Sequence, residues 1–129
     1  MASNGLALGK IGQISINGIR SLDKSIDFYR EKLRLPFIAV FDPPGLAFFD
    51  CDGTHLMLTT EGEANNSTIH FQVDDVQAAY KSLKAAKVDM EGEPHAIFTT
   101  DNYELWVAFF HDPEGNLHAV QEERGRFAP

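Results

Sequence analysis

The sequence is poor in cysteine, because Cys51 is the single one among its 129 residues. One thiol cannot form an intramolecular disulfide, and it excludes the zinc sites that are built from clustered cysteines. The neighbouring Asp50 and Asp52 are expected to raise the pKa of this thiol, since their negative charges oppose a thiolate. Cys51 is therefore predicted to be structural, and the cytoplasm is the expected compartment.

The sequence also lacks long hydrophobic runs and an excess of positive charge. No apolar run approaches the roughly 18 residues of a membrane-spanning helix. The first ten residues, MASNGLALGK, lack the features of a secretory signal and are expected to form a loose tail. Eleven Lys and Arg stand against 19 Asp and Glu, which gives a net charge of -8. Such a charge opposes binding to nucleic acid or to anionic lipid, so neither is expected as a partner.

Hydrophobic residues make up 43% of the chain, and their spacing predicts a strand, a helix and three further strands in its first half. Residues 11–19 alternate apolar and polar, as in a half-buried strand. Ser21 is a predicted helix N-cap, and the helix should end before Pro36. The three further strands are predicted at 37–41, 46–50 and 55–60.

The same order returns after the polar segment 61–67. A strand is predicted at 68–73, followed by a helix that Asp74 or Asp75 caps. Three strands follow at 93–99, 105–111 and 117–121, and the charged tail 122–129 is expected to be loose. The predicted fold class is therefore α+β, with two tandem βαβββ modules.

The two halves agree in detail as well as in order. Their predicted helices align at one constant offset, which pairs Leu22 with Val76, Ile26 with Tyr80 and Tyr29 with Leu83. In both halves a Phe-Phe pair precedes a glycine turn and a last strand: Phe48-Phe49 before Gly53, and Phe109-Phe110 before Gly115. Self-similarity of this kind indicates a duplicated unit.

Three segments resemble motifs of a known family: SLDKSIDFYREKLRLPF, FQVDDVQAAYKSLKAAKV and FFHDPEGNLHAVQEE. They are similar, in this order, to the first-helix signature, the second-half strand and helix, and the closing hairpin of the vicinal oxygen chelate superfamily of glyoxalases, bleomycin resistance proteins and extradiol dioxygenases. The resemblance implies that residues 1–129 form a single glyoxalase-like domain, with module one at about 10–60 and module two at about 67–123. It also implies an incomplete barrel around a cleft, a homodimer and, in members with chemistry, one divalent metal in the cleft.

In that family, the metal ligands come from the first and last strands of each module. The resemblance places these four cleft-lining positions at Gln13, Met57, Thr68 and Ala119. Glutamine is a weak ligand, a thioether suits copper(I) better than harder divalent ions, threonine rarely binds metal, and alanine cannot. The expectation is therefore no cofactor, with a divalent metal as the alternative. A slip of one residue in the comparison would put His118 in place of Ala119.

Two histidines and a tryptophan are further candidates for the site. His55 and His70 share strand faces with Met57 and Thr68, because side chains two residues apart in a strand point the same way. Each histidine is a candidate general acid or base or a displaced metal ligand, and a structural role stays open for both. Trp106 is a candidate for lining the cleft.

Three functions remain open at this point. The favoured one is the binding of a small, partly apolar molecule in the cleft without a metal, which resembles how bleomycin resistance proteins sequester a drug. The alternative is a metal-dependent lyase, isomerase or dioxygenase with a displaced site around His55 and His70. A regulatory or structural dimer without a ligand is the third.

Overall fold

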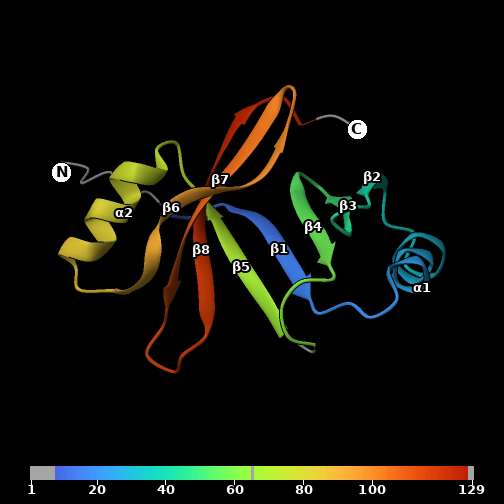
Figure 1. The fold of residues 1–129 in the computed structure, drawn as a ribbon, viewed down its shortest axis with the longest axis horizontal. Coiled ribbons are helices and arrows are strands. Elements are labelled where there is room, and N and C mark those ends of the chain that lie inside the picture. The colour runs from blue at the N-terminus through green and yellow to red at the C-terminus, as the bar shows by residue number, and fades with distance from the viewer. Residues whose placement is uncertain (1–7, 65, 128–129) are drawn as a thin grey trace. The chain divides into compact units, whose positions relative to one another are not determined.

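The structure is a computed structural model that describes residues 8–64 and 66–127. These residues form two compact units, which are called module one and module two. Module one comprises Gly12–Thr68, and module two comprises Ile69–Phe127 together with residues 8–11. Figure 1 shows the strands and helices of both modules.

Module one contains four strands in the spatial order β2-β3-β4-β1. They are β1 (Ile11–Asn17), β2 (Phe37–Phe41), β3 (Leu46–Cys51) and β4 (Thr54–Thr59). β1 and β4 are parallel, whereas the other two pairs are antiparallel. Between β1 and β2 in sequence, the helix α1 (Leu22–Asp27) continues as a π-helical turn, η1 (Phe28–Lys32).

Module two repeats this arrangement in the order β5-β8-β7-β6. Its strands are β5 (Asn66–Gln72), β6 (Asp89–Thr100), β7 (Tyr103–His111) and β8 (Leu117–Gly125), and its helix is α2 (Val76–Ala85). Again the first and last strands, β5 and β8, are parallel, and the other pairs are antiparallel. The predicted α+β class and the two βαβββ modules are thereby confirmed.

β6 is longer than the sequence predicts. It begins at Asp89, and its pairing with β7 shifts in register between Glu91 and His95, on either side of Pro94. Proline is tolerated here because β6 is the last strand in the order of module two, where its outer edge needs no backbone donor. The proline therefore interrupts the ladder without ending the strand.

The C-terminal strand β8 also extends further than predicted. Glu122 and Gly125 were expected to belong to a loose tail, but Glu122 pairs with Trp106 and Gly125 with Tyr103 in the β7 ladder. The expectation of a loose tail is wrong for 122–125, because β7 supplies a partner strand along that whole length. Residues 1–7 and 128–129, also predicted to lie in tails, are outside the described residues.

In each module the helix packs on one face of the sheet, which we call the helix-covered face; the opposite one is the helix-free face. In module one the helix-covered core consists of Leu22, Ile26, Ala47, Phe49 and Leu58. In module two it consists of Val73, Val76, Ala79, Leu83, Ala108 and Val120. Each large apolar side chain buried in this way stabilises the module by roughly 1.5–3 kcal/mol. None of the helices in the described part of the chain is long and apolar enough to cross a membrane.

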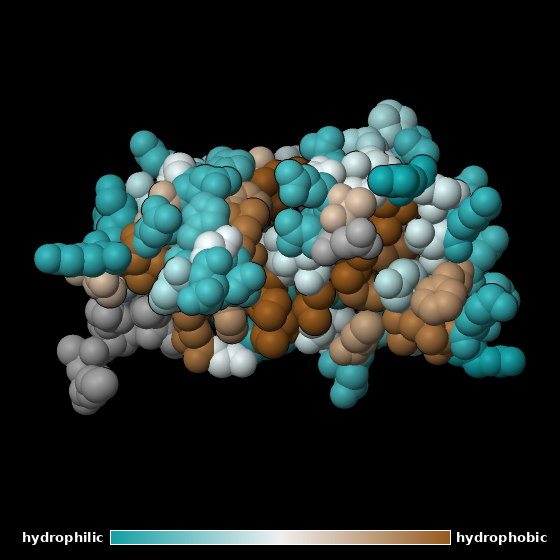
Figure 2. Space-filling model, turned by 90° about the horizontal axis from the view of Figure 1, so that it is seen from below, coloured by the Kyte–Doolittle hydropathy of each residue, from teal (hydrophilic) through white to brown (hydrophobic). Residues whose placement is uncertain are grey.

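Some hydrophobic side chains also reach the surface. Figure 2 shows brown, hydrophobic residues between the teal, hydrophilic ones on one face of the molecule. The large hydrophobic residues that are exposed in module one are Phe28, Leu33 and Val40. Phe28 and Leu33 belong to one turn, because the backbone N–H of Leu33 donates to the carbonyl oxygen of Phe28 at the end of η1.

The helix caps of the two modules give a matched pair for a stability measurement. Oδ1 of Asp75 accepts hydrogen bonds from the backbone N–H groups of Gln77 (3.0 Å) and Ala78 (3.1 Å). We expect Asp75→Ala to lower the free energy of unfolding by about 1 kcal/mol in urea denaturation, as the loss of an N-cap does. Ser21→Ala should cost less, since Oγ of Ser21 accepts one longer bond of 3.4 Å from the N–H of Lys24. An equal or larger loss for Ser21→Ala would contradict this ranking.

Candidate functional site

Three of the predicted site residues come together on the helix-free face of module one. Gln13 of β1 is fully buried, and Met57 of β4 is 7% exposed. The Nε2 of Gln13 donates a hydrogen bond to the Sδ of Met57 over 3.8 Å. His55 is the register partner of Gln13 in the parallel ladder, and its ring lies 6.1 Å from that of Phe48.

Strand alternation explains why these residues share a face. Leu56 and Leu58 of β4 pack into the helix-covered core, so the residues between and beside them must point the other way. His55 and Met57 therefore lie on the helix-free face, as the sequence predicts from their spacing. On this face the Nε2 of Gln13 and the Sδ of Met57 are paired with each other.

The helix-free face of module two carries His70 next to Ala119. The two are register partners in the parallel β5/β8 ladder, and both are buried. Ala119 packs in an apolar cluster with Leu105 and Val107, so it contributes no polar group. The ring of His70 lies 6.3 Å from that of Phe109.

Thr68, the remaining predicted position, precedes His70 by two residues on β5. It is buried, with 3% of its surface exposed. Its Oγ1 accepts a hydrogen bond of 3.4 Å from the Nδ2 of Asn17. The threonine hydroxyl is thus engaged by a neutral side chain of the protein.

The β5/β8 ladder also decides between Ala119 and His118 for the fourth position. The ring of His118 lies near those of Phe71 (6.3 Å) and Phe110 (5.8 Å), and both phenylalanines pack against the core under α2. His118 therefore points to the helix-covered face. Ala119, not His118, shares a face with His70.

Burial keeps His70 neutral. It lowers the pKa of His70 from 6.5 to about 4, although a hydrogen bond with Gln121 opposes this shift in part. A neutral imidazole both donates and accepts a hydrogen bond. As a base with a pKa near 4, it is poorly matched to proton abstraction at neutral pH.

Sequence reasoning misses Gln121, which is fully buried and is the residue that contacts His70. Its Nε2 donates a hydrogen bond of 2.8 Å to the Oε1 of Gln72. The signal that could have found Gln121 is its spacing, since it follows Ala119 by two residues and so shares its face. The same rule links His55 to Met57.

Trp106 belongs to a polar network near the start of α2. Its Nε1 donates to the Oε1 of Glu104 (2.8 Å), and the guanidinium of Arg124 lies 4.2 Å above its ring. The Nε of Arg124 donates to the Oε2 of Glu122 (2.7 Å). The Oε1 of Glu122 accepts from the backbone N–H of Val76 (2.9 Å), the first residue of α2. This network attaches the helix to the β7/β8 ladder.

Trp106, a candidate for lining the cleft, does not share a strand face with Ala119. Trp106 packs against the helix-covered core, whereas Ala119 packs with Leu105 and Val107 on the opposite face. The physical reason is alternation along β7. Leu105 and Val107 flank Trp106 and take the face of Ala119, so Trp106 must take the other.

The donor atoms at the four expected ligand positions do not fit a divalent metal. Ala119 has no donor atom, and the sulfur of Met57 already accepts a hydrogen bond from Gln13. The amide and hydroxyl oxygens of Gln13 and Thr68 are neutral and weak ligands. Within residues 8–64 and 66–127, no three His, Cys, Asp or Glu side chains are grouped closely enough to hold a metal ion.

The thiol of Cys51 lies at the end of β3. Its pKa is raised, first by burial and then by the negative charge of Asp50. The direction agrees with the expectation from the sequence, whereas burial, the larger cause, is not visible there. A thiol with a raised pKa is a weak nucleophile at neutral pH.

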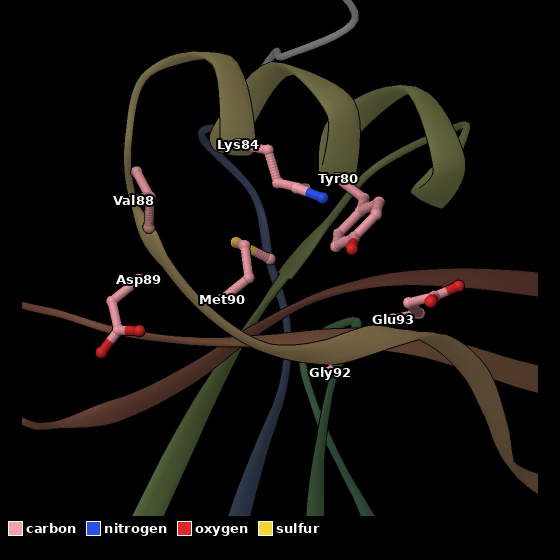
Figure 3. Close-up of a pocket in the computed structure, with 7 residues that line it drawn as sticks. All are labelled: Tyr80, Lys84, Val88, Asp89, Met90, Gly92 and Glu93. Carbon is pink, nitrogen blue, oxygen red and sulfur yellow. The ribbon is translucent and has the colours of Figure 1, made fainter.

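Each module also has a cavity between its helix and the strand at the outer end of its spatial order, β2 or β6. In module two a cavity of about 430 Å³ lies between α2 and β6, with Tyr80 and Lys84 pointing into it from the helix (Figure 3). In module one a cavity of about 460 Å³ lies between α1 and β2, and Arg30 and Phe37 help to line it. None of the predicted site residues lines either cavity.

Comparison with known proteins identifies related sequences and folds. Residues 10–120 match the family model described as "Glyoxalase/Bleomycin resistance protein/Dioxygenase superfamily". A curated relative, the uncharacterized protein YraH of Bacillus subtilis (strain 168), is 29% identical over 115 residues, which cover 77% of this chain and 88% of YraH. A superfamily member from Vibrio splendidus 12B01 has a similar solved structure, with a TM-score of 0.66, 13% identity, and coverage of 85% of this chain and 95% of that one.

Two larger proteins contain a similar fold. The Mn(II)-bound glyoxalase from Novosphingobium aromaticivorans gives a TM-score of 0.62 at 19% identity, and covers 95% of this chain and 42% of its own. The 2,3-dioxygenase LapB from Pseudomonas sp. KL28 gives 0.65 at 20% identity, with 96% and 44%. This chain spans less than half the length of these two proteins, and at such identities the likeness shows the fold alone.

The lowered pKa of His70 makes the stability of the protein depend on pH. Between pH 6.5 and about 4, the unfolded state binds a proton at this residue that the folded state does not, so the free energy of unfolding falls as the pH drops. Over the whole interval His70 should account for about 3 kcal/mol of that fall. Urea denaturation from pH 4 to 7.5 should show a shallower dependence for His70→Gln than for wild type or for the exposed control His95→Gln. An unchanged slope in His70→Gln would refute this assignment.

Proposed function

The chain belongs to the Glyoxalase/Bleomycin resistance protein/Dioxygenase superfamily, and on that premise we propose that it binds a small, partly apolar molecule on the helix-free faces of its modules, without a catalytic metal. The observation that carries the proposal is the contact between Gln13 and Met57. In module one, the two side chains at the expected ligand positions are engaged with each other. In module two, Ala119 occupies one such position and has no donor atom.

The composition of the helix-free faces supports a ligand that is partly apolar. In module one, Phe48 and Met57 are buried beside the polar Gln13. In module two, Val107 and Phe109 pack around Ala119, next to the neutral His70. Ligand sites commonly combine apolar walls with a few polar groups that fix orientation.

The alternative function, a metal-dependent lyase, isomerase or dioxygenase, would use His55 and His70. These histidines lie on the helix-free faces of module one and module two respectively. The low pKa of His70 leaves its imidazole unprotonated and weakly basic at neutral pH, which favours a hydrogen-bonding role over proton transfer. We therefore rank this alternative second.

A homodimer and a cytoplasmic location are also part of the proposal. Exposed hydrophobic side chains such as Phe28, Leu33 and Val40 on module one support association, since such residues often mark protein interfaces. Light scattering after size-exclusion chromatography should give twice the mass of one 14.4 kDa chain. A mass of 14.4 kDa would contradict the dimer without affecting ligand binding.

Metal content tests the first part of the proposed function. Protein expressed in medium with added manganese, iron, nickel and zinc, and purified without chelators, should contain far less than one divalent ion per chain by mass spectrometry. Its melting temperature should not change with EDTA. One tightly bound ion per chain would overturn the proposal. If that ion were lost in His55→Ala and His70→Ala but kept in the exposed control His95→Ala, the displaced metal site would be supported instead.

Ligand binding tests the second part. A panel of small aromatic and aliphatic molecules should include some that raise the melting temperature, because a ligand at 100 times its Kd stabilises the folded state by about 2.7 kcal/mol. We expect the same increase with and without EDTA. Stabilisation that appears only after a divalent metal is added would favour the enzyme, and stabilisation by no molecule in the panel would favour a structural dimer.

A further inference from the structure

The amide oxygen of Gln13 bears on the chemical class of the ligand. Gln13 is fully buried, and its Nε2 donates to the Sδ of Met57 over 3.8 Å. Among the residues that the structure describes, its Oε1 has no hydrogen-bond partner. A buried acceptor without a partner costs roughly 1–3 kcal/mol of stability, so most such atoms in folded proteins are paired.

The orientation of this amide follows from chemistry. A thioether sulfur accepts hydrogen bonds and cannot donate one, so the NH₂ group of Gln13 must face Met57. The opposite orientation would place the carbonyl oxygen against the lone pairs of the sulfur. Among the described residues, the atom of Gln13 that remains unpaired is therefore Oε1, a hydrogen-bond acceptor.

The charged residues of the strands also bear on the class of ligand. Arg124 is the single Lys or Arg in the eight strands that the structure describes. It lies above Trp106, which packs on the helix-covered face, and its Nε donates to Glu122. An anionic ligand on either helix-free face would therefore find no basic side chain from a strand to pair with.

The charged residues on the helix-free faces are acidic. Asp50 of β3 is the register partner of His55, and its Oδ1 accepts from the backbone N–H of Gly53. Glu123 of β8 accepts a hydrogen bond of 2.7 Å from the hydroxyl of Tyr103. For a ligand at Gln13 the relevant carboxylate is that of Asp50 in the same module, which disfavours an anion and is compatible with a neutral or positively charged molecule.

From these observations we propose that the ligand donates a hydrogen bond from a hydroxyl or N–H group to the Oε1 of Gln13, and that it carries no negative charge. The inference rests on the proposed function and deepens it, since it names the ligand class for the same face. In this arrangement the protein supplies the hydrogen-bond acceptor and the ligand supplies the donor.

Matched probes test this inference. Indole and phenol carry a donor, 1-methylindole and anisole are their methylated counterparts without one, and indole-3-carboxylate adds a negative charge. In titration calorimetry with EDTA present, we expect each donor to bind roughly tenfold more tightly than its methylated counterpart, and indole-3-carboxylate to bind more weakly than indole. In Gln13→Met, which keeps the length of the side chain, the donor preference should disappear.

The outcomes separate the inference from the proposed function. Equal or tighter binding of 1-methylindole, anisole or indole-3-carboxylate would overturn the inference and leave metal-independent binding in place. The same holds if Gln13→Met retains the donor preference. Binding that requires added Mn²⁺ would overturn the proposed function. Binding of none of the five probes, with or without Mn²⁺, would overturn both.

The stability of the free protein provides a second test. Gln13→Met removes an unpaired buried acceptor and should raise the melting temperature by about 3 °C. The matched control is Thr59→Val on the same face, because Thr59 is also buried and its Oγ1 accepts a hydrogen bond of 3.1 Å from the N–H of Glu61. Thr59→Val should lower the melting temperature and keep the donor preference. A decrease for Gln13→Met as large as that for Thr59→Val would show that the amide is fully paired, and would overturn the inference.

Discussion

The structure of each module depends on one constraint: a parallel pair of strands, β1 with β4 or β5 with β8, is covered by a helix on one side only. Side chains alternate along each strand, so every residue that does not pack under the helix must point to the other side. In this way Gln13 meets Met57 and His70 meets Ala119. The positions that would carry chemistry are therefore set by the same geometry that builds the core.

Burial then determines which chemistry those positions can perform. His70 is held neutral because a charged imidazole would lose its hydration, and Gln13 and Thr68 are uncharged in any case. The amide, thioether and hydroxyl of module one and the neutral imidazole of module two are each suited to hydrogen bonding. They offer little to a divalent cation, which prefers charged or strongly basic ligands.

The features that could be predicted from the sequence are those determined by neighbours along the chain. The caps Ser21 and Asp75 and the shared face of His55 and Met57 follow from local spacing, and all are present in the structure. The features that escaped depend on another strand. Alternation along β7 separates Trp106 from Leu105 and Val107, but packing between elements determines which of the two faces α2 covers. Residues 122–125 form a strand because β7 lies beside them. No pattern within those short segments carries that information.

The interruption of β6 at Pro94 has a consequence for the protein at high concentration. β6 is a strand of 12 residues at one end of the order in module two, and a long exposed edge is a template for aggregation. Pro94 removes a backbone donor from this strand, while Glu91 and Glu93, which precede the proline, add negative charge. Approach of a second strand would be opposed by both effects. Pro94 makes β6 look shorter in the sequence than it is. The same proline opposes the pairing of further strands with this edge, and so opposes fibril growth.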